Sequence, residues 1–480
     1  MTDLEEIGAL VDRRAETYIA LADEVWRAAE LNWREISSAR AVAGRLAQEG
    51  FALQQPACGM ETAFIAQWKN GTGGPVIAFL CEYDALPGLS QQPGLDEPQP
   101  LCAGAPGHGC GHNLLGAGSA AAAAAFKDWC TAHDVAATVR CYGCPAEEDG
   151  GGKVFFAKAG AFDDVDAVLA WHPGDVNYVL GQGCLAVTGV TYRFTGKAAH
   201  AASAPYAGRS ALDACELMNV GCNYLREHII STARLHYAYR DTGGTAPNVV
   251  PAHACLHYYI RAPKVTQMME IKSRVDDVAR GAALMTGTRL EIRAIDGFSD
   301  YVPNRTLSQV LADTLRQAGA PAWDAEDRAL AARFAATMTP EERAGNLAAS
   351  LESACAPMEI YEGGLLDGTT AAYVHRPELA EPGSTDVGDV SYCAPTAQLY
   401  AACQVLGTAG HSWQVTAQSA SSIGRKGMLK AAQVLAGTAA RLAGSPRLLA
   451  QAREEHRRAC PNGYCSPMPA DARPEPAAEQ

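Results

Sequence analysis

The chain has 480 residues, of which 48% are hydrophobic and 19% are charged, so it contains ample material for a folded core. Its formal net charge of −14 argues against nucleic acid or an anionic membrane as a partner, because both select a basic face. The sixteen cysteines are scattered along the chain, and the N-terminal segment MTDLEEIGALVDRRAETY lacks an apolar signal core. We therefore expect a reduced, cytoplasmic protein.

The first third of the sequence predicts an α/β domain. Residues 4–50 are expected to be helical, because apolar side chains recur there at helical spacing. Apolar runs of strand length follow at 61–68, 75–84, 137–145 and 166–173. An Ala-rich helix is predicted to start at Asn113, a good capping residue. This alternation predicts a mostly parallel sheet with helices on both faces.

Residues 187–300 have a different pattern. Their alternating and amphipathic segments follow the order β-α-β-β-α-β, which is typical of a ferredoxin-like unit. The chain is thus expected to form one domain from 1–186 and 301–462, interrupted by this unit. Residues 324–383 predict an insertion or long loop, and the Pro-rich residues 463–480 predict a disordered tail.

Two short strings carry groups that can bind metal. GHGCGHN contains His108, Cys110 and His112 in a Gly-rich turn, and thiolate and imidazole suit zinc or manganese. A flexible loop with an incidental Cys and His is the alternative. CPAEEDGGGK places Glu147 and Glu148 at the end of a predicted strand, where neighbouring side chains point opposite ways. One carboxylate could bind metal while the other acts as a base, although a solvated acidic turn would look the same.

Further candidates follow other apolar strands. His172 ends the strand at 166–173, His411 lies in a Gly-rich turn, and Asp84 follows the strand at 75–84. Each histidine alone could equally be structural. In open α/β sheets, however, sites form beyond the carboxyl ends of the strands. The joint placement predicts a cluster in which Asp84 orients one of five ligands: Cys110, His112, Glu148, His172 and His411.

These strings also carry a family resemblance over about residues 15–460. The sequence resembles the metallopeptidase family of aminoacylases, glutamate carboxypeptidases and N-acyl amino acid amidohydrolases. The matching strings, in collinear order, are CEYDALPGLSQQ, GHGCGHNLLGAGS, YGCPAEEDGGGK, FDDVDAVLAWHP, GKAAHAASAP, GRSALDA, TAPNVVPA, IRAP, VPNRTL, STDVGDVS and GTAGHSW. The resemblance implies a catalytic domain at 1–186 and 301–462, interrupted by a lid and dimerisation domain at 187–300.

The resemblance also implies roles for individual residues. Two divalent ions, manganese or zinc, would be held by Cys110, His112, Glu148, His172 and His411. The catalytic residues would be Glu147 as general base, His200 as the oxyanion contact, often in a neighbouring subunit's site, and Asp84. Asn248 and Arg261 match lid positions that bind the substrate carbonyl and carboxylate.

One departure from the family pattern bears on the metals. The di-zinc branch has His where Glu82 stands and often Asp where Asn113 stands. The identity of the metal and the occupancy of a second site therefore stay open at this stage.

The implied activity is hydrolysis of a C–N bond. The lead candidate is the amide of a small N-acyl or N-aroyl amino acid, such as p-aminobenzoyl-glutamate. A dipeptidase or a hydrolytic deaminase of an aromatic amine would use the same metals and a different pocket. A non-catalytic binding subunit is a third possibility, against which the complete set of site residues argues. A homodimer or higher homo-oligomer through the lid, or a related second subunit, is also implied.

Overall fold

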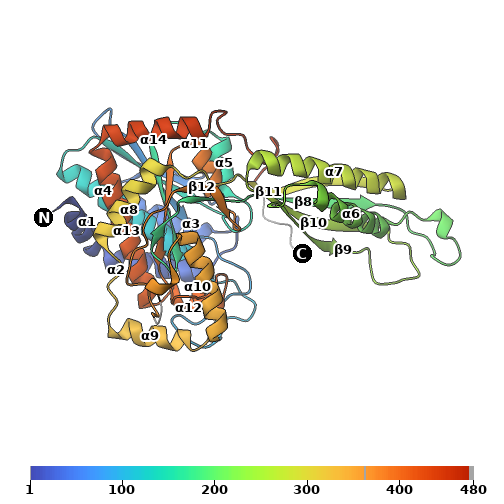
Figure 1. The fold of residues 1–480 in the computed structure, drawn as a ribbon, viewed down its shortest axis with the longest axis horizontal. Helices are drawn as coiled ribbons and strands as arrows, with labels where there is room; N and C mark the ends of the chain where they lie inside the picture. Colours follow the sequence, from blue (N-terminus) through green and yellow to red (C-terminus); the bar gives the residue numbers. More distant parts are fainter. Residues whose placement is uncertain (1, 362–363, 475–480) are drawn as a thin grey trace.

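The computed structural model describes residues 2–361 and 364–474 (Figure 1). Met1, the pair 362–363 within the predicted insertion, and residues 475–480 of the predicted tail lie outside the described residues. No helix in the described ranges is long and apolar enough to cross a membrane.

A seven-stranded, mostly parallel sheet forms the centre of the larger domain. Its order is β1-β2-β4-β3-β5-β13-β6, and the inner pairs β4–β3, β3–β5 and β5–β13 are parallel. The strands are β1 (Ala52–Gln54), β2 (Phe64–Asn70), β3 (Val76–Glu82), β4 (Ala137–Cys144), β5 (Ala167–Gly174), β6 (Tyr178–Val179) and β13 (Thr396–Ala402). The parallel order brings the carboxyl ends of β3, β4, β5 and β13 to one edge.

Helices cover both faces of this sheet, which confirms the predicted fold class. Ile77 and Phe79 of β3 pack into a large core on one face, while Ala78 and Leu80 pack into a second core on the other. The first face is covered by α1 (Asp3–Asp12), α2 (Ala15–Ala28), α3 (Ile36–Gln48), α4 (His112–Ala132), α8 (Arg305–Ala318), α13 (Ser422–Ala443) and α14 (Pro446–Ala459). The second face is covered by α5 (Gly152–Lys158), α10 (Pro340–Ala354) and α11 (Val387–Cys393).

The ferredoxin-like unit projects from one side of the larger domain (Figure 1). Its antiparallel sheet has the order β11-β8-β10-β9, and α6 and α7 cover one face through a separate core. The elements are β8 (Ala186–Thr195), α6 (Ala211–Leu225), β9 (Arg234–Asp241), β10 (His253–Ala262), α7 (Val265–Thr286) and β11 (Arg289–Phe298), with short turns η1 (Pro205–Ala207) and η2 (Arg226–His228). We call this unit the lid; the face of its sheet opposite the helices is its open face.

The helical region expected at 4–50 consists of three helices. The structure differs from expectation in two segments. The helix α4 starts at His112 with Gly111 as its N-cap, one residue before Asn113. Residues 324–383 are largely regular, because Asp324 and Thr339 form capping boxes that start helices. This segment contains α9 (Ala325–Ala335), α10, η3 (Met358–Ile360) and β12 (Arg376–Glu381), which pairs with β7 (Gln182–Cys184); α12 (Trp413–Gln418) follows later.

The described part of the C-terminal segment has no helix or strand but makes contacts. The Tyr464 hydroxyl donates to Asp389, and Met468 is buried against Val154, Val187 and Phe298. Residues 464–474 therefore run along the junction between the two domains.

Candidate metal centre

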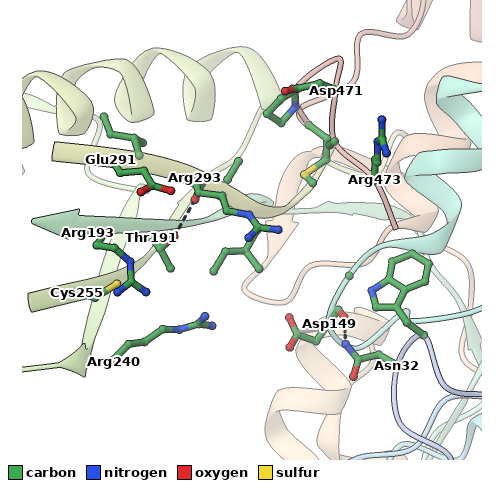
Figure 2. A pocket seen from close by; sticks show the side chains of 18 residues that line it. Asn32, Asp149, Thr191, Arg193, Arg240, Cys255, Glu291, Arg293, Asp471 and Arg473 are labelled. Carbon is green, nitrogen blue, oxygen red and sulfur yellow. Dashed lines mark hydrogen bonds between the residues drawn. The ribbon is translucent and has the colours of Figure 1, made fainter. Parts of the chain in front are cut away.

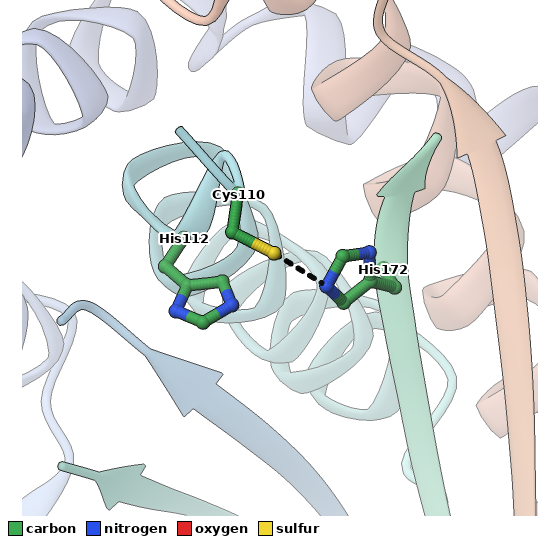
Figure 3. A group of neighbouring side chains, drawn as sticks. All are labelled: Cys110, His112 and His172. Atoms are coloured by element: carbon green, nitrogen blue, oxygen red, sulfur yellow. Dashed lines mark hydrogen bonds between the residues drawn. The ribbon is translucent and has the colours of Figure 1, made fainter. Parts of the chain in front are cut away.

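The predicted ligands converge beyond the carboxyl ends of the parallel strands. Glu147 and Glu148 follow β4, His172 lies near the end of β5, and His411 lies in the turn after β13. The turn into α4 supplies Cys110 and His112. Figure 3 shows that Cys110, His112 and His172 point toward one another from these elements.

Local backbone conformations make this convergence possible. Gly111 has φ +76°, a left-handed conformation that allows Cys110 and His112 to face the same point. His411 also lies in the left-handed region, with φ 54°, and its backbone N–H donates to the Gly109 carbonyl at 3.0 Å. A non-glycine residue held this way is unusual and is often found at functional sites.

Several potential ligand atoms lie close together. The Nε2 atom of His112 is 3.4 Å from Oε2 of Glu82 and 3.9 Å from both Oε2 of Glu147 and Oε1 of Glu148. The Nε2 atom of His411 is 3.4 Å from Oε2 of Glu148, and Cys110 Sγ is 3.4 Å from His172 Nε2. These atoms form overlapping groups within 4.8 Å, a spacing that one or two cations could bridge.

The histidine rings are oriented as metal ligands usually are. His112 donates its Nδ1–H to Asp84 Oδ1 at 2.8 Å, and His172 donates its Nδ1–H to the Pro173 carbonyl at 2.7 Å. Each ring therefore presents the lone pair of Nε2 to the site. The second oxygen of Asp84 accepts from the backbone N–H of Glu148 at 2.9 Å, so Asp84 positions two of the predicted ligands.

Buried polar atoms without hydrogen-bond partners further test whether the site suits a metal ion. In the described chain, Oε2 of Glu82, Nε2 of His112 and Oε1 of Glu148 are buried and have no hydrogen-bond partner. A buried polar atom without a partner costs roughly 1–3 kcal/mol, and three such atoms facing one point are costly without a cation. The donor set and its geometry therefore fit divalent metal ions.

Comparison with known proteins assigns the family. Residues 78–409 match the model of peptidase family M20/M25/M40. The chain belongs to this family. It is 42% identical to a p-aminobenzoyl-glutamate hydrolase subunit of Escherichia coli (strain K12), across 98% of this chain and 100% of that one. It is 31% identical to an Xaa-Arg dipeptidase of Mus musculus, across 93% and 90% of the two chains.

Solved structures share the fold of this M20-family chain. A dinuclear metal-binding M20 peptidase from Bacillus subtilis superimposes with a TM-score of 0.57 at 18% identity, covering 91% of this chain and 99% of the other. Family membership makes this chain a metal-dependent hydrolase acting on C–N bonds, as the sequence resemblance implied.

Burial and mutual charge set the pKa values of the acids in this M20 centre. Burial, followed by the charge of Glu82, raises the pKa of Glu147 to about 8, and burial raises the pKa of Glu148 to about 7. Burial also raises the pKa of the Cys110 thiol and lowers the pKa of His172 to about 4. The Asp84 carboxylate raises the pKa of His112 despite its burial. Bound cations would favour the ionised acids and the neutral imidazoles.

Motif reasoning missed a buried charge network behind the centre. Lys153 is fully buried on α5; its Nζ lies 2.7 Å from Glu82 Oε1 and also donates to Asp386. The backbone N–H of Lys153 donates to the same Asp386 carboxylate at 2.9 Å. The only available signal was a lysine directly after the glycines of CPAEEDGGGK, which is also the pattern of a solvated turn.

The predicted lid residues divide into two groups. Arg261 lines a cavity of about 530 Å³ that also contains Cys110, Glu147, His172 and His411. Arg261 donates to the Ser384 hydroxyl at 2.7 Å. The structure does not bring His200 or Asn248 into this cavity.

Both of those residues are exposed in lid loops. The His200 Nδ1 accepts from the backbone N–H groups of Ala202 and Ser203, each at 3.2 Å. The backbone carbonyl of Asn248 accepts from Ala201. Two other residues of the motifs are hydrogen bonded to backbone carbonyls. His108 is hydrogen bonded to the Val25 carbonyl, and Asn113 donates to the carbonyls of Ala22 and Ser419.

Proposed function

We propose that this chain hydrolyses the amide bond of a small N-acyl or N-aroyl amino acid, with p-aminobenzoyl-glutamate as the first substrate to test. The observation that carries the proposal is the Glu147 carboxylate beside converging ligand atoms, in a cavity that also contains Arg261. The E. coli relative, named for this substrate, supports it through similarity over nearly the whole chain. The mouse relative makes a dipeptidase the second candidate.

The metal ligands we propose are Cys110, His112, Glu148, His172 and His411. Thiolate, imidazole and carboxylate donors together suit zinc or manganese, and Glu82 offers a further oxygen next to His112. When bound, the ions polarise the scissile carbonyl and lower the pKa of the attacking water. Cys110 would bind as a thiolate, although burial alone raises the pKa of its thiol.

We assign to Glu147 the transfer of a proton from the attacking water to the leaving group. Its carboxylate accepts a proton from the attacking water and returns it to the nitrogen of the leaving group. Arg261 binds the carboxylate of the amino-acid half, because its guanidinium can make two parallel hydrogen bonds to a carboxylate. The hydrogen bond from Arg261 to Ser384 holds the guanidinium at the cavity wall.

Glu147→Gln tests the assignment of the general base. We expect kcat for p-aminobenzoyl-glutamate to fall about 10²- to 10⁴-fold, because the amide cannot accept the proton. Metal content, measured by elemental analysis, should stay at the wild-type value. Glu61→Gln, an exposed residue outside the cavity, is the matched control. Turnover within about threefold of wild type would exclude Glu147 as the base.

A second subunit would complete the site. We propose that the chain forms a homodimer or higher homo-oligomer through the lid, or pairs with a related subunit, and that His200 acts in a neighbouring site. Large apolar side chains are exposed on the lid helices, including Tyr224 at 77%, Leu284 at 85% and Met285 at 67%. Exposed apolar side chains of this size often mark protein contacts.

Subunit complementation tests the role of His200. We expect His200→Ala to lower kcat much more than it changes KM, because an oxyanion contact strengthens in the transition state. Mixing inactive His200→Ala with inactive Glu147→Gln should restore up to about a quarter of wild-type activity if subunits exchange at random. No recovery from mixtures that light scattering shows to be mixed oligomers would exclude action between subunits.

We also propose a cytoplasmic location. All sixteen cysteines lie within the described residues, and each is free. Unpaired cysteines are typical of reducing compartments.

A further inference from the structure

A second cavity lies between the lid and the catalytic domain (Figure 2). It has a volume of about 630 Å³ and separates the open face of the lid from the catalytic domain. Arg193, Arg240 and Arg293 line it from the lid, and Asn32 and Asp149 line it from the catalytic domain. None of the residues assigned to the hydrolytic reaction lines this cavity, so it needs a separate explanation.

Some residues that line the two cavities are neighbours in the sequence or lie on one face of the same strand. Glu148 lines the metal cavity, and the next residue, Asp149, lines the second. On β10, alternate residues face the same side: Tyr259 and Arg261 line the metal cavity, and Cys255 lines the second. At about 3.3 Å per residue, Cys255 lies roughly 13 Å beyond Tyr259. An extended molecule could therefore reach from one cavity into the other.

Strand pairing gathers the arginines on this face. Arg193 of β8 lies opposite Cys255 of β10, and Thr191, two residues before it, lies opposite Arg293 of β11. Arg240 reaches the same area from β9 and donates to the His257 ring at 3.4 Å. Within the described residues, neither Arg193 nor Arg240 forms an ion pair with a carboxylate within 4.0 Å, and the charge of Arg240 acts on Asp149 at longer range. Their guanidinium groups are therefore available to an anionic ligand.

Acidic side chains also line this cavity and reduce its positive charge. On the lid side, the arginines still outnumber the acidic residues. Glu291 lies opposite Arg193 in the register of β11 and β8, while Asp149 faces the lid from the catalytic domain. Asp471 and Arg473 of the C-terminal segment stand at the rim (Figure 2). On the lid side, Arg193 and Arg240 stand against Glu291.

We propose that this second cavity is a carboxylate-binding subsite for an acidic extension of the substrate. The inference rests on the proposed hydrolysis of an N-acyl amino acid whose carboxylate contacts Arg261. A chain that continues past Arg261 along β10 enters the second cavity, where Arg193 and Arg240 bind its further carboxylates. The substrate class is thus amides whose amine half is a short acidic peptide of about three to four residues, which at roughly 3.5 Å per residue matches the roughly 13 Å between Tyr259 and Cys255.

The same cavity disfavours basic leaving groups. An arginine side chain placed there would meet Arg193 and Arg240, and like charges in a partly enclosed cavity repel. Cleavage of dipeptides ending in arginine, after which the mouse relative is named, would therefore be disfavoured in this chain.

Binding of triglutamate to the Glu147→Gln protein tests the subsite without turnover. We expect triglutamate to bind at least about tenfold tighter than glutamate by calorimetry, because each charged hydrogen bond contributes about a factor of ten. The double variant Arg193→Gln/Arg240→Gln should lose this difference, while Glu291→Gln should tighten binding. Arg280→Gln, an exposed arginine on the helical side of the lid, is the control. Equal affinity for triglutamate and glutamate, or a difference that survives the double variant, would overturn the proposal.

Kinetics then separate this inference from the proposed function. With the wild-type enzyme, kcat/KM for p-aminobenzoyl-triglutamate should exceed that for p-aminobenzoyl-glutamate, and the double variant should remove the advantage through KM. If the shorter amide is cleaved but triglutamate gains no affinity, the subsite is refuted and the proposed function stands. If triglutamate binds through the two arginines but neither amide is cleaved, the proposed function is refuted and the subsite stands.

Discussion

Lys153→Met should destabilise the protein strongly, because the lysine is fully buried between Glu82 and Asp386. Removing one partner of a buried ion pair costs about 3–5 kcal/mol, which is a large part of a typical total of about 5–15 kcal/mol. Methionine keeps the apolar volume of the side chain, so the loss reports charge and not packing.

Protonation of Asp386 makes this cost depend on pH. Burial raises the pKa of Asp386 to about 7 even with Lys153 present. Without the lysine, Asp386 would take up a proton at neutral or acidic pH and relieve part of the penalty. We therefore expect a loss of about 3–5 kcal/mol at pH 8 and a clearly smaller loss at pH 5.5.

Urea denaturation in the presence of a chelator measures this effect in the metal-free protein. Lys158→Met on the same helix is the matched control, because its Nζ makes an exposed hydrogen bond to the Pro469 carbonyl; it should cost less than about 1 kcal/mol. Adding Asp386→Asn to Lys153→Met should recover part of the loss. A loss below about 1 kcal/mol at pH 8, or equal losses at both pH values, would refute the reasoning.

Two further predictions concern residues around the centre. A Cβ on Gly116 would lie 2.5 Å from the backbone oxygen of Glu82, so Gly116→Ala should cost about 1–3 kcal/mol in urea denaturation. Gly44→Ala, in open space on α3, should instead stabilise by up to about 1 kcal/mol, and the same sign for both would contradict this account. Burial, and after it the charge of Asp84, raises the pKa of Glu35 from near 4.5 to about 8. The protonated Glu35 side chain therefore contributes its full stabilisation below pH 4.5, and this stabilisation is lost as pH rises toward 8. Between pH 5 and 8 the chelated wild type should therefore lose stability more steeply than Glu35→Gln, and parallel curves would exclude this group as the cause.

The sequence alone was sufficient to predict the positions of the site residues that follow apolar strands. Glu148 and His172 each end such a strand, so the parallel order of the sheet places them at one edge without further information. Cys110 and His112 were predictable because a short Gly-rich turn leaves little freedom for their side chains. Family membership confirms the metal-dependent chemistry that these residue types indicated.

Other features depend on contacts between distant segments. Lys153 is held behind the metal centre in part by Asp386, which lies more than 200 residues later in the chain. Residues 324–383 were expected to be irregular because the segment is rich in Ala and Glu; Asp324 and Thr339 start its two helices through side-chain caps. The role proposed for His200 depends on a neighbouring subunit, which no pattern within one chain can supply.

The two ends of the lid lie next to each other, so the lid could be removed or exchanged as a unit. Val187 at its entry and Phe298 at its exit are direct partners on adjacent antiparallel strands. The points at which the chain leaves and re-enters the catalytic domain are therefore about 5 Å apart. A few residues could span this gap if the whole lid were excised. A lid of different sequence could therefore be grafted at these two points without cutting any strand of the seven-stranded sheet.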